Sequence, residues 1–193
     1  MGKIIKTPLA VVYVDEKKRL SIGENLDLSR SSEVWGFCFY EEISKCNLFI
    51  SKNNGPNLTF KQADKWAYEQ FEPYFMEGNE VILYGGLPHY EEMLVLFFGY
   101  YDYIAKMLKI FRKNGITADD FYEDEYLVYS DEVFLNPYDV HIRRFLPHQE
   151  VNVPFSYKAM RTDDGGEKIL SFKKETAPYD RKFHTRLFLH QFS

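Results

Sequence analysis

Residues 85–94, with the sequence GGLPHYEEML, organise the fold because they join a strand to a helix through one sharp turn. The apolar run at residues 80–84 predicts a buried strand, which the paired glycines and the proline end. Residues 90–98 are apolar on nearly all sides, which predicts a helix in the centre of the core. Gly99 loosens that helix, and a capping aspartate and a glycine stop predict a second helix over residues 102–114.

Four strands and one further helix are predicted ahead of this stretch. Thr59 and Gln62 have the spacing of a capping box, and apolar residues then recur at helical spacing, so a helix is expected from Thr59 until Pro73 ends it. Short apolar runs bounded by turn residues predict the strands, which are residues 9–14, 20–22, 34–40 and 47–50.

After Asp119 the pattern is that of strands joined by loops. Apolar and polar residues alternate, and residues 163–166 have the composition of a hairpin turn. The predicted strands are residues 126–129, 138–145, 151–160, 169–172 and 183–192. No repeat or long linker divides the chain, so residues 1–193 are predicted to form one α+β domain, with helices in the first half and an antiparallel sheet in the second.

The composition is that of a soluble globular protein. Of the 193 residues, 45% are hydrophobic and 27% are charged, and this length allows a substantial core. The formal net charge is −5, with lysine and arginine spread along the chain, which argues against nucleic acid or an anionic membrane surface as a partner. No apolar run reaches the roughly 18 residues of a membrane-spanning helix, so no membrane insertion is expected.

The N-terminal residues 1–14 lack the apolar segment and the cleavage site of a signal peptide. We therefore expect a protein of the cytoplasm or of a virion, or of the cell surface if a leader has been removed. The two cysteines, Cys38 and Cys46, lie in strand-like surroundings, where buried free thiols are the more common state. No histidine is close to them in sequence, so they do not indicate a zinc site.

Several motifs, in their order along the chain, resemble those of a known group of domains. The start at residues 8–13 (PLAVVY) resembles that group's Gly-Val-Val-Phe/Tyr opening, and residues 85–93 (GGLPHYEEM) resemble its Trp-Arg-Leu-Pro-Thr turn and glutamate-rich helix start. Residues 103–108 (YIAKML), 128–132 (VYSDE) and 185–192 (TRLFLHQF) resemble its later helix, its Tyr-Trp-Ser-Ser-x-Glu strand and its closing strand, although neither signature tryptophan is present. The chain thus resembles the bacterial C-type-lectin-like domains of the Fibrobacter-type major paralogous and Lcl C-terminal families.

This resemblance implies a C-type-lectin-like fold with a twisted antiparallel sheet, with the two termini paired as adjacent strands, and with long loops that display a surface. Such domains generally bind or display, so the implied function is non-enzymatic recognition of a protein or a glycan ligand. Two alternatives stay open. One is a structural subunit of a phage virion (a fibre, tail or head-decoration protein), able to form a homo-oligomer, and the other is an uncharacterised enzyme.

Candidate binding residues lie in or beside the predicted late strands, where basic and aromatic residues are interspersed as at many protein and glycan interfaces. The candidate ligand-binding residues are Arg143, Arg144, His148, Tyr157, Lys158 and Arg161. The histidines, cysteines and carboxylates show no metal-ligand, triad or paired-carboxylate spacing, and no phosphate-binding loop is present. We therefore predict no catalytic residues, no metal and no cofactor.

Overall fold

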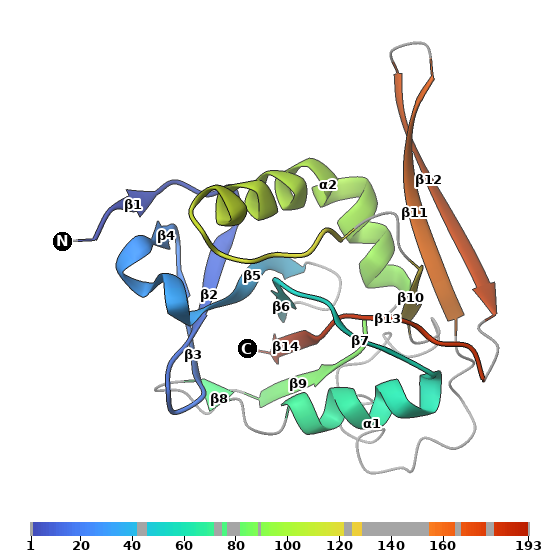
Figure 1. Cartoon of the computed structure of the whole chain (residues 1–193), viewed down its shortest axis with the longest axis horizontal. Coiled ribbons are helices and arrows are strands. Elements are labelled where there is room, and N and C mark those ends of the chain that lie inside the picture. The colour runs from blue at the N-terminus through green and yellow to red at the C-terminus, as the bar shows by residue number, and fades with distance from the viewer. Residues whose placement is uncertain are drawn as a thin grey trace.

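The computed structural model describes residues 2–41, 46–71, 75–76, 82–88, 90–121, 125–128, 155–164, 167–176 and 180–192. Most of the strands lie in the first half of the chain, the main sheet is largely antiparallel and curls like half a barrel, and the helices lie in the middle of the chain (Figure 1). The fold is therefore α+β, with strands both before and after the helical segment.

The larger sheet has seven strands in the order β8-β3-β2-β5-β6-β14-β9. They are β2 (Ala10–Val14), β3 (Arg19–Gly23), β5 (Val34–Glu41), β6 (Cys46–Ser51), β8 (Phe75–Met76), β9 (Ile82–Gly86) and β14 (Phe188–Phe192). Neighbouring strands are antiparallel except for β3 and β8. The short connections from β2 to β3 and from β5 to β6 favour these local pairings because they close small loops at low entropic cost.

A smaller sheet has five strands in the order β12-β11-β10-β13-β7. They are β7 (Gly55–Leu58), β10 (Glu125–Val128), β11 (Phe155–Asp164), β12 (Glu167–Thr176) and β13 (Phe183–Thr185). β11 and β12 pair along their whole length as a hairpin that projects beyond α2 in Figure 1. Near the N-terminus, β1 (Ile4–Ile5) pairs with β4 (Leu26–Asp27), and the 3-10 helix η1 (Leu28–Glu33) follows.

Two helices cover opposite faces of the larger sheet: α1 (Phe60–Phe71) and α2 (Tyr90–Lys113) (Figure 1). The buried cluster under α1 includes Val12, Leu20, Cys38, Phe49, Ala63, Ala67 and Leu189. The buried cluster under α2 includes Val11, Phe37, Leu48, Ile50, Leu96, Ile104, Leu108 and Phe188. Successive residues of a strand point to opposite faces, so each central strand contributes to both clusters.

The helix α2 is continuous, so the prediction of two helices separated near Gly99 was wrong. Gly99 is exposed in the middle of α2, and Asp102 lies within the helix instead of at its start. A glycine inside a helix costs about 1 kcal/mol relative to alanine. The flanking residues Leu96 and Ile104 are fully buried, and burial of each such side chain contributes about 2 kcal/mol. Packing on the sheet therefore outweighs the local preference.

The prediction of a C-type-lectin-like fold was also wrong. The strands β1 to β7 precede α1, so the chain does not place helices in its first half and a sheet in its second. The first strand, β1, pairs with β4 and not with the last strand, β14. The predicted partner of β14, β2, lies between β3 and β5, while β14 lies between β6 and β9. A strand has only two edges, so β2 and β14 have none left for each other. A similar order of motifs thus belongs to a different topology.

Cys38 is a buried free thiol on β5, as its sequence context predicted. Burial raises the pKa of this thiol to about 12, because the thiolate would lose its hydration. We predict that iodoacetamide at pH 8 leaves Cys38 unmodified in the folded protein and alkylates it after unfolding in urea, as followed by peptide mass spectrometry. Alkylation of Cys38 in the native protein at the rate of an exposed cysteine would contradict this burial.

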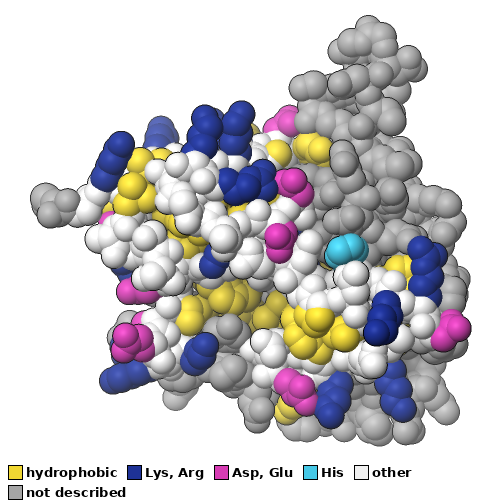
Figure 2. Space-filling model, viewed as in Figure 1, with side chains coloured by type: hydrophobic (Ala, Val, Ile, Leu, Met, Phe, Trp, Pro, Cys, Tyr) yellow, Lys and Arg dark blue, Asp and Glu magenta, His cyan; other side chains and the backbone are white. Residues whose placement is uncertain are grey.

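Charged side chains of both signs are spread over the face in Figure 2, and lysine and arginine side chains gather along α2. The exposed basic residues of α2 are Lys106, Lys109, Arg112 and Lys113. Within the described ranges, no helix combines the length and the apolar character that a membrane crossing requires.

Candidate ligand-binding site

A β-bulge at the start of β5 sets the position of Trp35. Val12 of β2 lies opposite Gly36, and the next residue, Tyr13, lies opposite Val34. Trp35 is therefore an extra residue in β5 with no residue opposite it on β2. A bulge of this kind interrupts the alternation of side chains along a strand and re-aims one of them.

The bulge places Trp35 on the α1 face of the larger sheet. Val34 and Phe37, which are three residues apart, both belong to the buried cluster under α2. Trp35 instead packs against the cluster under α1, which contains Cys38. Strict alternation would have placed Trp35 on the same face as Phe37, inside the α2 core. The bulge thus leaves a half-buried indole at the margin of the α1 cluster.

Lys52 binds both carbonyl groups of the bulge. Its backbone N–H donates to the Trp35 carbonyl oxygen at 3.0 Å, and its ammonium group donates to the Val34 carbonyl oxygen. Lys52 is half-buried, and the loss of hydration lowers the pKa of its ammonium group below the ordinary lysine value. The carbonyl groups of Val34 and Trp35 therefore both find a donor on a single residue.

The fully buried Arg186 holds the segment that carries Lys52. Its Nε donates to the Ser51 carbonyl oxygen at 2.8 Å, and its Nη2 donates to the Lys52 carbonyl oxygen at 2.7 Å. The same guanidinium donates to the carbonyl oxygens of Asp119 at 3.0 Å and Asp120 at 3.3 Å. Arg186 thus ties the end of β6 to the segment after α2, at the point where the chain passes from β13 in the smaller sheet to β14 in the larger one.

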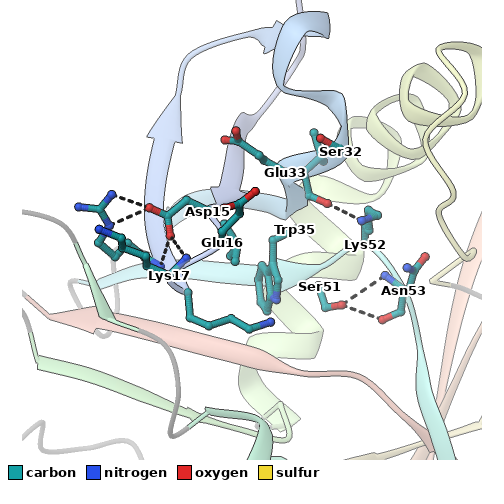
Figure 3. A pocket seen from close by; sticks show the side chains of 13 residues that line it. Asp15, Glu16, Lys17, Ser32, Glu33, Trp35, Ser51, Lys52 and Asn53 are labelled. Carbon is teal, nitrogen blue, oxygen red and sulfur yellow. Dashed lines mark hydrogen bonds and ion pairs between the residues drawn. The ribbon is translucent and has the colours of Figure 1, made fainter.

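A cavity of about 730 Å³ opens beside Trp35. Its walls are residues 14–19 of the β2–β3 turn, residues 32–35 at the junction of η1 and β5, and residues 51–53 at the end of β6. Figure 3 shows the Trp35 ring between Asp15 and Lys17 on one side and Lys52 and Asn53 on the other. The indole is therefore a central part of a wall that is otherwise mostly polar.

The carboxylate of Asp15 holds the β2–β3 turn in place. It accepts hydrogen bonds from the backbone N–H groups of Lys17 at 2.8 Å and Arg19 at 2.9 Å, and from Arg19 Nε at 2.7 Å. These bonds, of which the one from the Arg19 backbone has the largest effect, lower the pKa of Asp15. Lys18 completes the turn in the left-handed region, with φ of 62°. One side of the cavity is thus formed by a well-ordered turn.

Ion pairing leaves the cavity with an excess of positive charge. Asp15 pairs with Arg19 at 2.7 Å, and Glu33 pairs with Arg30 at 2.6 Å. The walls contain four other charged residues: Glu16, Lys17, Lys18 and Lys52. None of these four forms an ion pair with another described residue. Three ammonium groups therefore face one carboxylate, in a chain whose formal net charge is −5.

A buried polar contact lies on the α2 face of the larger sheet, opposite to the face on which Trp35 lies. Glu92 of α2 and His190 of β14 are both buried, and Glu92 Oε1 is in contact with His190 Nε2. This contact joins α2 to the sheet. In the part of the chain that the structure describes, no three His, Cys, Asp or Glu residues are placed to hold a metal ion.

The structure describes only some of the binding residues predicted from the sequence. Those outside the described residues are Arg143, Arg144 and His148. Tyr157, Lys158 and Arg161 lie on β11. They belong to the smaller sheet, whereas Trp35 belongs to the larger one. Their role in binding stays a prediction.

Sequence reasoning missed Trp35 and Lys52. The pattern accounts for Trp35 as one of several aromatic residues in the predicted strand 34–40, and it places Lys52 in a polar loop. One signal was present, namely Gly36 inside an otherwise apolar strand. A glycine in that position often marks a bulge or the close approach of another backbone.

No protein-family model, curated protein or solved structure matches this chain. The function is therefore argued from the cavity itself: the indole of Trp35, the polar walls and the excess of ammonium groups.

Proposed function

We propose that this protein is a non-enzymatic binding domain that recognises a glycan in the cavity beside Trp35. The observation that carries this proposal is the half-buried indole that the β-bulge directs to a polar cavity. An indole offers a flat apolar surface to the C–H face of a sugar ring. Ser51 and Asn53, in the same walls, supply donors and acceptors for sugar hydroxyl groups.

The composition of the walls favours a saccharide over an apolar molecule. Pockets for apolar ligands are lined mainly by hydrophobic side chains. Here the hydrophobic wall residues, among those described, are Val14, Val34 and Trp35, and the others are polar or charged. A volume of about 730 Å³ lies within the usual range for ligand sites and suits a short oligosaccharide.

The site is also formed before any ligand binds. Lys52 holds the bulge, Arg186 holds the backbone of Lys52, and Asp15 holds the turn. A preformed site loses less conformational entropy on binding than a mobile one, so more of the contact energy contributes to affinity. This arrangement suits a domain whose task is recognition.

We predict that Trp35→Ala lowers the affinity for a bound oligosaccharide at least about tenfold, because the indole supplies most of the apolar contact. A printed panel of neutral and acidic oligosaccharides identifies the binders of the full chain, and calorimetry with the tightest binder measures the affinity. Tyr68→Ala serves as the matched control, since Tyr68 is a half-exposed aromatic on α1 outside the cavity walls.

Tyr68→Ala is expected to leave the affinity unchanged, and melting temperatures confirm that both variants are folded. Two results would refute the proposal: the wild-type chain binding no member of the panel, or a folded Trp35→Ala variant binding as tightly as the wild type.

A further inference from the structure

The charges of the cavity point to the class of glycan. We infer that the ligand is an acidic saccharide, whose carboxylate binds to the ammonium group of Lys52 while a sugar ring stacks on Trp35. This inference rests on the proposed glycan-binding function, and it adds the chemical class of the ligand and a residue that determines specificity.

The ammonium group of Lys52 is partly desolvated, and no carboxylate among the described residues forms an ion pair with it. Its ammonium group donates to the carbonyl oxygen of Val34, which uses one of its three N–H bonds. Burial of an ammonium group is unfavourable unless an anion compensates for the lost hydration, and burial accordingly lowers the pKa of Lys52. A ligand carboxylate at Nζ supplies that compensation.

The carboxylates in the walls do not take this role: arginine residues hold two of them, and the third, Glu16, forms no ion pair with Lys52 among the described residues. Asp15 is bound by Arg19 through Nε and Nη2, each at 2.7 Å. Glu33 is bound by Arg30 through Nε at 2.7 Å and Nη2 at 2.6 Å. Charge-assisted bonds of this kind from two guanidinium nitrogens fix a carboxylate in place. The ammonium group of Lys52 therefore remains available to an anion that enters the cavity.

The backbone fixes Trp35 and Lys52 next to each other. The N–H of Lys52 donates to the Trp35 carbonyl oxygen at 3.0 Å, and both side chains line the same cavity (Figure 3). A sugar acid combines an apolar C–H face with a carboxylate at the edge of the ring, so one residue of such a saccharide presents both groups that this pair requires. Exposed Lys17 and Lys18 extend the positive charge along the turn and favour a chain of acidic sugars.

The test compares matched pairs of oligosaccharides, each containing uronic or sialic acid and paired with the same molecule after reduction of its carboxyl groups to alcohols. We expect the wild-type chain to bind at least one acidic member about tenfold or more tightly than its reduced partner, as measured by calorimetry in low salt. Lys52→Gln is expected to bring this ratio close to one, because glutamine keeps a donor for the Val34 carbonyl but carries no charge. Lys106→Gln, on the exposed side of α2, is the control and keeps the wild-type ratio.

The outcomes separate this inference from the proposed function. Trp35-dependent binding of the reduced oligosaccharides, at the same affinity as the acidic ones, would overturn the inference and leave the proposed function standing. Equal loss of both affinities in a folded Lys52→Gln variant would also overturn it, because Lys52 would then act only by supporting the bulge. Failure of the wild-type chain to bind any saccharide would overturn both.

Discussion

Gly36→Ala is expected to lower the free energy of unfolding by about 3 kcal/mol, because the added methyl group has no space. A Cβ atom at Gly36 would lie 1.9 Å from the carbonyl oxygen of Ile50 and 2.9 Å from its carbonyl carbon. Both atoms belong to the backbone of β6, which cannot rotate away as a side chain can. Relief of the overlap requires β5 and β6 to move apart within the seven-stranded sheet.

Equilibrium unfolding in urea measures this effect. Gly99→Ala is the matched control, since a Cβ atom at this exposed helical position meets no atom within 4 Å. It is expected to raise the free energy of unfolding by about 0.5–1 kcal/mol, because alanine is the better helix former. The same chemical change thus has opposite signs at the two positions. Equal unfolding midpoints for both variants would contradict the close approach of β5 and β6.

Arg186→Met is expected to lower the free energy of unfolding by about 4 kcal/mol, since it removes all the hydrogen bonds that this fully buried guanidinium donates. The guanidinium of Arg186 donates to four backbone carbonyl oxygens, and its Cζ lies 4.7 Å from the centre of the Phe121 ring. Methionine replaces much of the apolar volume but none of the hydrogen bonds. The four contributions are not independent, so the expected total is less than their sum.

Arg112→Met is the matched control because Arg112 binds the same segment after α2 from the surface. It donates to the carbonyl oxygen of Ala118 at 3.1 Å and pairs with Asp120 at 2.9 Å, and both partners of that pair are solvent-exposed. Exposed ion pairs contribute less than about 1 kcal/mol, so this variant should unfold close to the wild type. Urea unfolding compares the two variants. Similar losses in their free energies of unfolding would show that the buried position of Arg186 does not add to its contribution to stability.

Much of the secondary structure could be predicted because it follows from short-range patterns. The strands expected at residues 9–14, 20–22, 34–40 and 47–50 correspond to β2, β3, β5 and β6, and a helix follows Thr59 as its capping residues indicate. Turn residues and apolar periodicity are local properties, so a single sequence contains them. These local properties do not specify which strands pair with each other in a sheet.

The topology, and the point at which a predicted strand is split in two, depend on contacts between residues that are distant in sequence. The last predicted strand, residues 183–192, is divided at Arg186 between two sheets, and β14 inserts between β6 and β9. The likeness of motif order to lectin-like domains gave a wrong topology for this reason. An order of motifs constrains which elements exist, whereas neighbours are set by side-chain burial on both faces of a sheet.

The candidate site shows the same division. The charged turn at residues 15–19, the aromatic strand and the glycine within it can be read from the sequence, because residue type and spacing are enough to produce these features. The position of Trp35 beside a cavity with Lys52 depends on contacts between distant strands, because the bulge forms through the pairing of β5 with β2 on one edge and with β6 on the other. Arg186, more than 130 residues further along the chain, then holds Ser51 and Lys52 in place.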